Sequence, residues 1–169
     1  MAKLAEINAG DQADFVRILG GIFEQSPWVA AETYARRPFR AIRQLHAELS
    51  ATVAKSGPAR QLALIRAHPD LAGRLAQAGQ LTPESTREQA AAGLNQLAAA
   101  ELGEFHRLNA AYRERFGFPF VICARLNDRA AIFQAMQRRL LHPPAEEIAT
   151  ALAEIDKIAW LRLQDALKD

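Results

Sequence analysis

The sequence predicts an all-α fold, a single-domain helical bundle of about eight or nine helices. Three observations support this prediction. Glycine and proline are scarce, at 9 and 8 of 169 residues. The segments between them are rich in Ala, Leu, Arg, Gln and Glu, which favour helices. Apolar residues in these segments recur at spacings of three and four, as on one face of a helix.

The first half of the chain is expected to form four helices. The first is amphipathic and carries Gly20-Gly21, which suggests a close approach between helices; its apolar face is marked by Phe15, Ile18, Leu19, Ile22 and Phe23. A proline fits the first turn of each of the next three helices. These begin at Pro27 (after Ser26 as N-cap, running to about residue 36), Pro38 (to about Lys55) and Pro58 (to the break at His68-Pro69).

The second half is also expected to be helical, with one exception. Thr82-Pro83-Glu84 has the order of an N-cap, a proline and an acidic first turn. Phe118–Ala124 is short and continuously apolar, so it is strand-like, but one strand cannot form a sheet alone. The expected helical segments are 71–78, 82–93, about 102–116, 128–141 and 144–168. A length of 169 residues fits one domain, 1–169, with one core.

Composition and simple motifs exclude several classes. The single cysteine, Cys123, excludes a disulfide framework and a Cys-rich zinc site. No apolar run approaches the roughly 18 residues of a membrane span, and no signal-like segment opens the chain, so we expect a soluble cytoplasmic protein. Nucleotide-binding, zinc-protease and serine-hydrolase motifs are absent. The four histidines lie far apart, so no metal site is expected.

His68 is the first candidate site residue. Pro69 places it at a helix break, and the neutral pKa of histidine suits proton transfer or hydrogen bonding to an anion. The alternative is a turn histidine that caps the preceding carbonyl groups.

Ser85, Glu88 and Gln89 form the second candidate. A helix that begins at Thr82 places their hydroxyl, carboxylate and amide along one face. Alternatively, Ser85 and Glu88 form a capping box, although Thr82-Pro83 is the better helix start.

The third candidate is the apolar segment with Phe118, Phe120, Val121 and Ile122. Pro119 and the extended pattern leave backbone N–H groups outside a helix, and buried donors need partners. A ligand's carbonyl groups could accept from them, or other backbone groups could.

Two arginine features remain. Arg162 follows Ile148 and Ile155 at seven-residue steps, so its charge lies near an apolar helix face. It requires a protein carboxylate or a substrate carboxylate, unless its side chain extends to the edge of that face. The basic stretch Arg36–Arg43 is most simply a solvated face, with nucleic-acid binding as the alternative.

These pieces, in this order, resemble the 2-oxo-4-hydroxy-4-carboxy-5-ureidoimidazoline (OHCU) decarboxylase family of uric acid degradation. Each piece is weak alone, but the ordered series is specific and spans nearly the whole chain. The matching stretches are Phe23–Ala30, Arg37–Phe39, Leu64–Ala72, Leu81–Thr82, Ser85, Glu88–Gln89, Ala92–Leu94, Leu108–Tyr112, Phe116–Ile122 and Ile158–Leu163.

The resemblance implies an all-helical homodimer that decarboxylates OHCU to (S)-allantoin without metal or organic cofactor. It places the catalytic roles on His68 and Glu88. It implies substrate contacts at Pro69, Ser85, Gln89, Phe118, Phe120, Val121, Ile122 and Arg162. The partner is then a small-molecule substrate, with neither nucleic acid nor membrane. The alternative function is a non-catalytic helical module that binds a small ureido ligand or nucleic acid.

Overall fold

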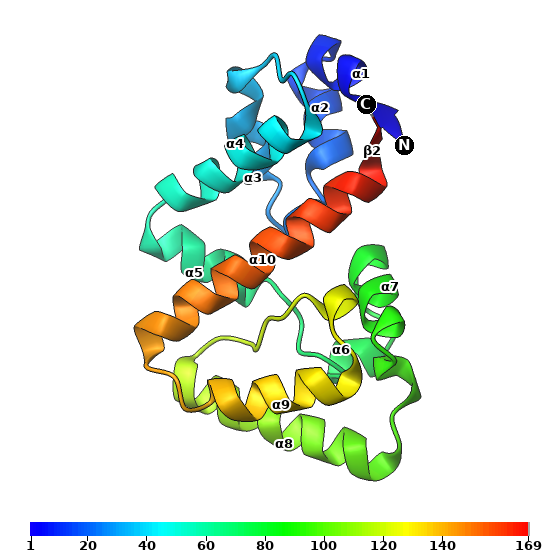
Figure 1. The fold of residues 1–169 in the computed structure, drawn as a ribbon, viewed down its shortest axis with the longest axis vertical. Helices are drawn as coiled ribbons and strands as arrows, with labels where there is room; N and C mark the ends of the chain where they lie inside the picture. Colours follow the sequence, from blue (N-terminus) through cyan, green and yellow to red (C-terminus); the bar gives the residue numbers. More distant parts are fainter. Residues whose placement is uncertain (169) are drawn as a thin grey trace. The chain divides into compact units, whose positions relative to one another are not determined.

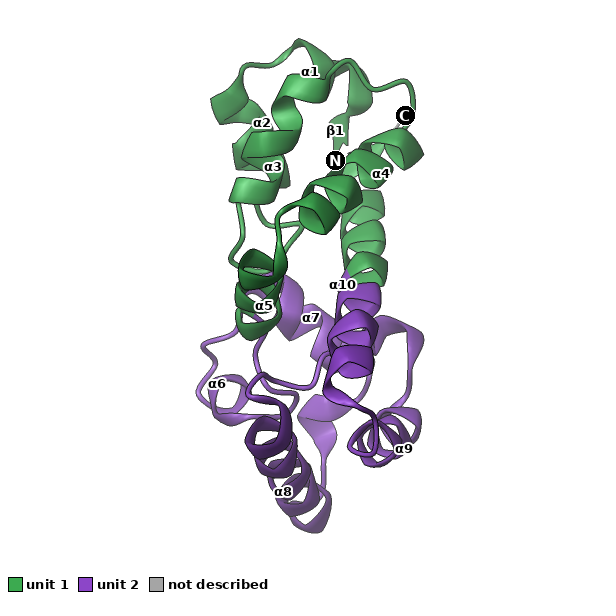
Figure 2. Ribbon diagram, turned by 90° about the vertical axis from the view of Figure 1, so that its left-hand side faces the viewer, with its two compact units in different colours: residues 1–67, 156–169 green, residues 68–155 purple. Residues whose placement is uncertain are grey.

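The computed structural model describes residues 1–168, which form a helical protein (Figure 1). This part of the chain contains ten α-helices, three short 3₁₀ helices and one two-stranded sheet. The predicted all-α class is therefore confirmed. The chain divides into two compact units, residues 1–67 with 156–168 and residues 68–155 (Figure 2).

The first unit contains the early helices and the end of the last one. Two strands pair in parallel, with Ala2 opposite Leu167 and Lys3 opposite Lys168, a pairing that the sequence did not predict. The elements are β1 (Ala2–Lys3), α1 (Leu4–Ala9), α2 (Gln12–Leu19), α3 (Trp28–Thr33), η1 (Tyr34–Arg36), α4 (Ile42–Lys55), α5 (Pro58–Arg66), the second part of α10 (Pro144–Ala166) and β2 (Leu167–Lys168).

The second unit contains the candidate residues other than Arg162. Helices α8 and α9 pack side by side in it, and α7 contacts η3 (Figure 1). The elements are α6 (Arg74–Gln77), α7 (Pro83–Ala91), η2 (Leu94–Gln96), α8 (Ala99–Phe116), η3 (Ala124–Leu126), α9 (Arg129–Arg139) and the first part of α10. Buried Phe105, Leu108, Ile132 and Met136 belong to its core.

The first amphipathic helix is shorter than expected. Helix α2 ends at Leu19, and Ile22 and Phe23 are buried in turns beyond it. A Cβ on Gly20 would lie 2.5 Å from the Val16 carbonyl oxygen. The same Cβ would lie 3.3 Å from the Cβ of Pro27. The absence of a side chain at Gly20 therefore permits the close approach of the chain at Pro27.

Helix α4 begins at Ile42 and not at Pro38. The Asn8 side chain binds Phe39 on both sides, accepting from its N–H at 2.8 Å and donating to its carbonyl at 2.7 Å. The Arg40 N–H donates to the Gln44 side chain at 2.7 Å. These bonds hold the backbone before Ile42 outside the helix.

Within residues 1–168, the apolar segment between α8 and η3 pairs with no strand. Residues 118–123 are buried and irregular, and η3 begins at Ala124. This agrees with the expectation that one strand-like segment cannot form a sheet. Its backbone groups therefore lack the ladder that a sheet would supply.

Candidate active site

His68 lies just after the end of α5. Arg66 is the last residue of that helix and Ala67 is its C-cap. The His68 side chain is buried, with 6% of the residue exposed. Pro69 follows it and prevents the helix from continuing, as the sequence predicts.

The backbone after His68 turns sharply. Ala72 has a φ of +50°, in the left-handed region that alanine rarely adopts. A Cβ on Gly73 would lie 2.7 Å from the Cβ of Asp70, so only glycine fits there. We call residues 68–73 the histidine loop.

One face of α8 anchors the histidine loop. The Arg113 Nε lies 2.9 Å from Asp70 Oδ1, and the Asn109 amide donates to the Leu71 carbonyl at 2.9 Å. The His106 Nε2 lies 3.3 Å from the Ala72 carbonyl oxygen. These three α8 residues are spaced by three and four positions, so they share a face. The loop backbone is fixed although it is not helical.

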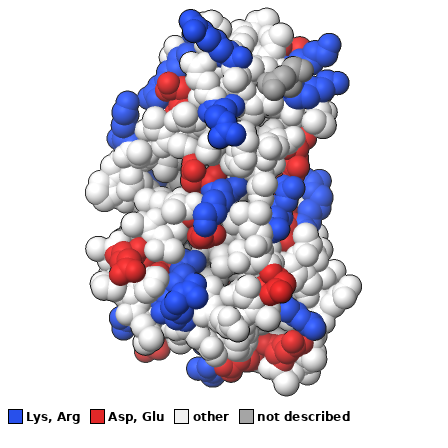
Figure 3. All heavy atoms as spheres, viewed as in Figure 1, with Lys and Arg blue, Asp and Glu red and all other residues white. Residues whose placement is uncertain are grey.

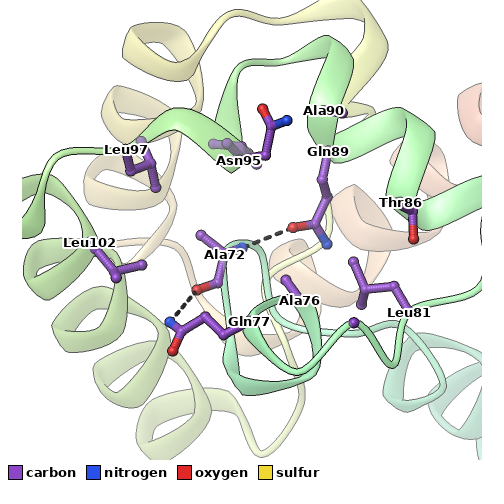
Figure 4. Close-up of a pocket in the computed structure, with 12 residues that line it drawn as sticks. Ala72, Ala76, Gln77, Leu81, Thr86, Gln89, Ala90, Asn95, Leu97 and Leu102 are labelled. Atoms are coloured by element: carbon purple, nitrogen blue, oxygen red, sulfur yellow. Dashed lines mark hydrogen bonds between the residues drawn. The ribbon is translucent and has the colours of Figure 1, made fainter.

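Helix α7 supplies a second anchor and the predicted polar face. The Thr82 hydroxyl accepts from the Ser85 N–H at 3.2 Å, which confirms Thr82 as the N-cap. Ser85 and Gln89 are buried and Glu88 is partly buried. The Gln89 Oε1 accepts from the Ala72 N–H at 2.9 Å, so it links α7 to the histidine loop (Figure 4).

A pocket of about 300 Å³ lies beside this link (Figure 4). Leu81, Leu97 and Leu102 give it apolar walls, and Gln77 and Asn95 add amides. Among the predicted site residues, only Gln89 lines it. The pocket is therefore not the predicted substrate site, although it shares the Gln89 wall.

The apolar segment offers backbone donors in a buried place. Phe118, Phe120, Val121 and Ile122 are each 8% exposed or less. Within residues 1–168, no group accepts a hydrogen bond from the backbone N–H of Val121 or Ile122. Buried N–H groups require acceptors, so these two donors can bind carbonyl groups of a ligand.

Arg162 belongs to the first unit, where a carboxylate of the protein binds it. Its Nη2 lies 2.9 Å from the Glu24 Oε2, and its Nη1 donates to the Gly21 carbonyl at 3.2 Å. Both side chains are almost fully buried, at 4% and 2% exposure. The structure thus bears out the protein-carboxylate alternative, and contact with a substrate carboxylate stays a prediction.

Two arginines of the basic stretch Arg36–Arg43 bind groups of the protein itself. Arg36 pairs with Glu48 at 2.7 Å, and Arg37 donates to the carbonyls of Asn8 and Gly10, each at 2.8 Å. On the face shown in Figure 3, basic and acidic side chains are interspersed. Nothing here favours the nucleic-acid alternative.

A buried polar group that the sequence pattern did not predict lies next to the apolar segment. Arg139 on α9 and Glu147 on α10 form an ion pair, and the Tyr112 hydroxyl donates to Glu147. Burial, followed by the Glu147 hydrogen bond, raises the pKa of Tyr112 far above its usual range, so the hydroxyl stays protonated. The missed signal was periodicity, because Arg139 follows Ile132, Ala135 and Met136 on the apolar face of its helix.

Residues 1–168 contain no group of three or more His, Cys, Asp or Glu side chains that could hold a metal ion. None of the helices in this range is both long and apolar enough to cross a membrane.

Comparison with known proteins gives consistent results. The OHCU decarboxylase family model matches residues 8–164. The OHCU decarboxylases of Mus musculus and Bos taurus are each 44% identical to this chain over 164 residues. These matches cover 97% of this chain and 92% and 96% of the mouse and cattle proteins.

Two crystal structures have the same fold. An (S)-allantoin synthase structure aligns with a TM-score of 0.79 and 32% identity, covering 99% of this chain and 54% of that one. An OHCU decarboxylase crystallised in the presence of (S)-allantoin aligns with a TM-score of 0.70 and 24% identity, covering 92% and 97%. The family match, the identities and the shared fold agree, and the chain belongs to the OHCU decarboxylase family.

Proposed function

We propose that this chain decarboxylates OHCU to (S)-allantoin in uric acid degradation. Membership of the family supports the reaction, and the buried N–H groups of Val121 and Ile122 are the structural observation that carries it. A flat substrate rich in ureido carbonyl groups supplies the acceptors that these donors need.

The chemistry of this substrate requires no electron-accepting cofactor. The bond from the ring carbon to the carboxylate breaks, carbon dioxide leaves, and the electron pair moves toward the adjacent C=N bond. The ring nitrogen of that bond takes up a proton. The resulting enol-like intermediate then loses its hydroxyl proton and gains a proton on the carbon that bears the ureido group, so each turnover consumes one proton. The substrate is thus its own electron sink, a task that pyridoxal phosphate performs elsewhere.

Each predicted residue has a role in this proposal. His68 binds the substrate hydroxyl and takes or polarises its proton, which suits an imidazole at neutral pH. Glu88 holds the His68 tautomer or binds ureido N–H groups. Ser85, Gln89, Pro69 and the segment Phe118–Ile122 fix the face of the ring, so that the proton arrives on one side. Arg162 orients the leaving carboxylate, although tight ground-state pairing alone does not speed its departure.

The first experiment measures turnover of freshly generated OHCU and the circular dichroism of the allantoin formed. We expect rapid loss of OHCU and an excess of the (S) enantiomer. Absence of any acceleration over spontaneous racemic decay would rule out the proposed function.

The second experiment tests the role of His68. Replacing His68 with Asn should abolish turnover and leave the thermal midpoint nearly unchanged, because Asn retains polarity but cannot transfer the proton. The control His46→Asn, in the first unit, should keep its turnover. A large loss of stability in His68→Asn would favour the turn-capping role of His68 instead.

Three broader properties belong to the same proposal. The chain acts as a homodimer, as a single domain, and in the cytoplasm. The family supports the dimer, and light scattering of the purified protein tests it. A mass of one chain at micromolar concentration would contradict it.

A further inference from the structure

A buried polar network lies against the apolar segment in the second unit. Its centre is Glu147, which is fully buried near the start of α10. The carboxylate accepts from the Arg139 Nε at 2.7 Å, from the Tyr112 hydroxyl and from the His142 Nδ1 at 2.9 Å. Arg139 is itself only 3% exposed. The network therefore holds one guanidinium in a fixed place.

This guanidinium also binds the apolar segment. The Arg139 Nη1 donates to the Val121 carbonyl at 2.8 Å. Its central carbon lies 4.3 Å from the centre of the Phe120 ring, a cation–π distance. The Tyr112 ring also meets Phe120 edge-on, with centroids 5.4 Å apart. One charged side chain, Arg139, and one aromatic ring, that of Tyr112, thus fix this part of the segment.

The planar peptide bond extends this constraint from the Val121 carbonyl to the Ile122 N–H. A trans peptide is planar, so the Val121 carbonyl and the Ile122 N–H point in opposite directions within one rigid plane. The bond from Arg139 therefore sets the direction of the Ile122 N–H. The next peptide is fixed as well, because the Cys123 N–H donates to the Glu154 Oε2 at 2.8 Å. The Ile122 N–H lies between these two anchors.

Packing alone does not require this arrangement. Desolvation makes a buried ion pair costly, and apolar residues of similar volume often give equal or greater stability. The Arg139–Glu147 pair instead binds and orients one carbonyl of an irregular segment, that of Val121. A charge-assisted bond to that carbonyl also polarises the peptide, which strengthens its N–H as a donor.

We infer that Arg139 is a positioning residue for the decarboxylation. Through the Val121 carbonyl it aims the Ile122 N–H at the substrate ring, and Glu147 and Tyr112 hold Arg139 for that task. This inference rests on the proposed function, because it assigns the Ile122 N–H to the substrate.

The test is a double variant that removes the charge pair without leaving a buried charge. In Arg139→Met with Glu147→Gln, the amide oxygen still accepts from Tyr112, and methionine fills the space of arginine. We expect a folded protein whose kcat/KM falls by about 10- to 100-fold, the size of effect that small misplacement produces. The enantiomeric excess of the allantoin should fall with it.

The stereochemical measurement separates positioning from stability. Enzyme concentrations are chosen so that OHCU disappears at the wild-type rate, which keeps the racemic background equal. The control Ile132→Val, a fully buried residue of α9, should lower stability by about 0.5 to 1.5 kcal/mol and leave kcat, KM and enantiomeric excess unchanged. A folded double variant with wild-type kcat/KM and enantiomeric excess would overturn the inference.

A second variant is used if the double variant does not fold. Arg139→Lys keeps the charge beside Glu147 but cannot reach both Glu147 and the Val121 carbonyl with the same fork. It should lower kcat/KM and enantiomeric excess in the same way, and unchanged values would overturn the inference. An inactive wild type would instead contradict the proposed function. Wild-type turnover is therefore measured first, and the variants test the role of Arg139 only once the wild type is shown to be active.

Discussion

Two glutamines hold Ala72 from opposite sides at the base of the histidine loop. The Gln89 Oε1 accepts from its N–H at 2.9 Å, and the Gln77 Nε2 lies 3.4 Å from its carbonyl oxygen (Figure 4). The two bonds differ in whether another group could take over from the glutamine. The Ala72 carbonyl has a second partner in His106, whereas the N–H bonds only Gln89 among residues 1–168.

Replacing Gln89 with Leu should therefore cost more stability than replacing Gln77 with Leu. The first change leaves a buried N–H without an acceptor, which costs about 1 to 3 kcal/mol. The second removes an exposed side chain and should cost less than about 0.5 kcal/mol. Urea unfolding of both variants measures the difference. Equal losses would show that the Gln89 bond does not hold the loop.

Single residues were predictable where local chemistry decides their place. Pro69 puts His68 at a helix break, and Thr82-Pro83 starts the helix that carries Ser85 and Gln89; the structure has both features. The partners of these residues were not predictable. Asn109 and Arg113 meet the histidine loop across about 40 residues of chain, a distance that no local pattern encodes.

At the scale of elements, α4 and α10 are joined by a titratable contact in the first unit. The His46 Nε2 lies 3.1 Å from the Asp156 Oδ1, which also accepts from the Ser50 hydroxyl. Hydrogen bonding to Asp156 raises the pKa of His46 above its ordinary 6.5, while burial and the nearby Arg43 oppose that rise. The same bond lowers the pKa of Asp156 below its ordinary 3.8.

The stability that this contact adds should depend on pH in a defined window. A raised histidine pKa gives stability that is complete below pH 6.5 and lost as the pH rises through the raised value. A lowered aspartate pKa gives stability that is complete above pH 3.8 and lost as the pH falls through the lowered value. The contribution is therefore greatest near pH 5, at less than about 1 kcal/mol, because Asp156 is partly exposed.

The variant His46→Asn tests this dependence by urea unfolding at pH 5 and pH 8. Its loss of stability relative to wild type should be larger at pH 5. The control Ser50→Ala removes a hydrogen bond without removing the titration of His46, so its loss should be similar at both values. A loss in His46→Asn that does not change with pH would contradict the assignment.

Helices were predictable as elements, but some of their ends were not. A proline or a cap marks the start of α5, α7 and α10, and all three begin within a residue of expectation. Helix α4 starts late because Asn8, distant in sequence, binds the backbone of Phe39. The irregular course of residues 118–123 depends in the same way on Arg139 and Glu154.

At the scale of the whole molecule, α10 belongs to both compact units. Its first part buries Ala151 and Ile155 in the second unit, and its later part buries Ile158, Ala159 and Leu163 in the first. Unfolding of either unit would remove packing from a helix that the other unit also uses. We therefore expect the two units to unfold together, as one domain.

Two optical probes can test this expectation in one urea titration. Both tryptophans, Trp28 and Trp160, lie in the first unit, whereas far-ultraviolet circular dichroism reports the helices of both. Coincident midpoints are expected for a single cooperative transition. Helical signal that persists after the fluorescence change is complete would show that the second unit unfolds separately.

The network behind the apolar segment also constrains how the sequence of this chain can change. Loss of Glu147 alone would leave the Arg139 charge buried without its counterion, and loss of Arg139 alone would do the same to Glu147, at about 3 to 5 kcal/mol each. Either step alone consumes a large part of a typical folding free energy. Positions 139 and 147 can therefore change together but rarely one at a time, and an evolutionary path that abandons the pair must cross a poorly folded intermediate.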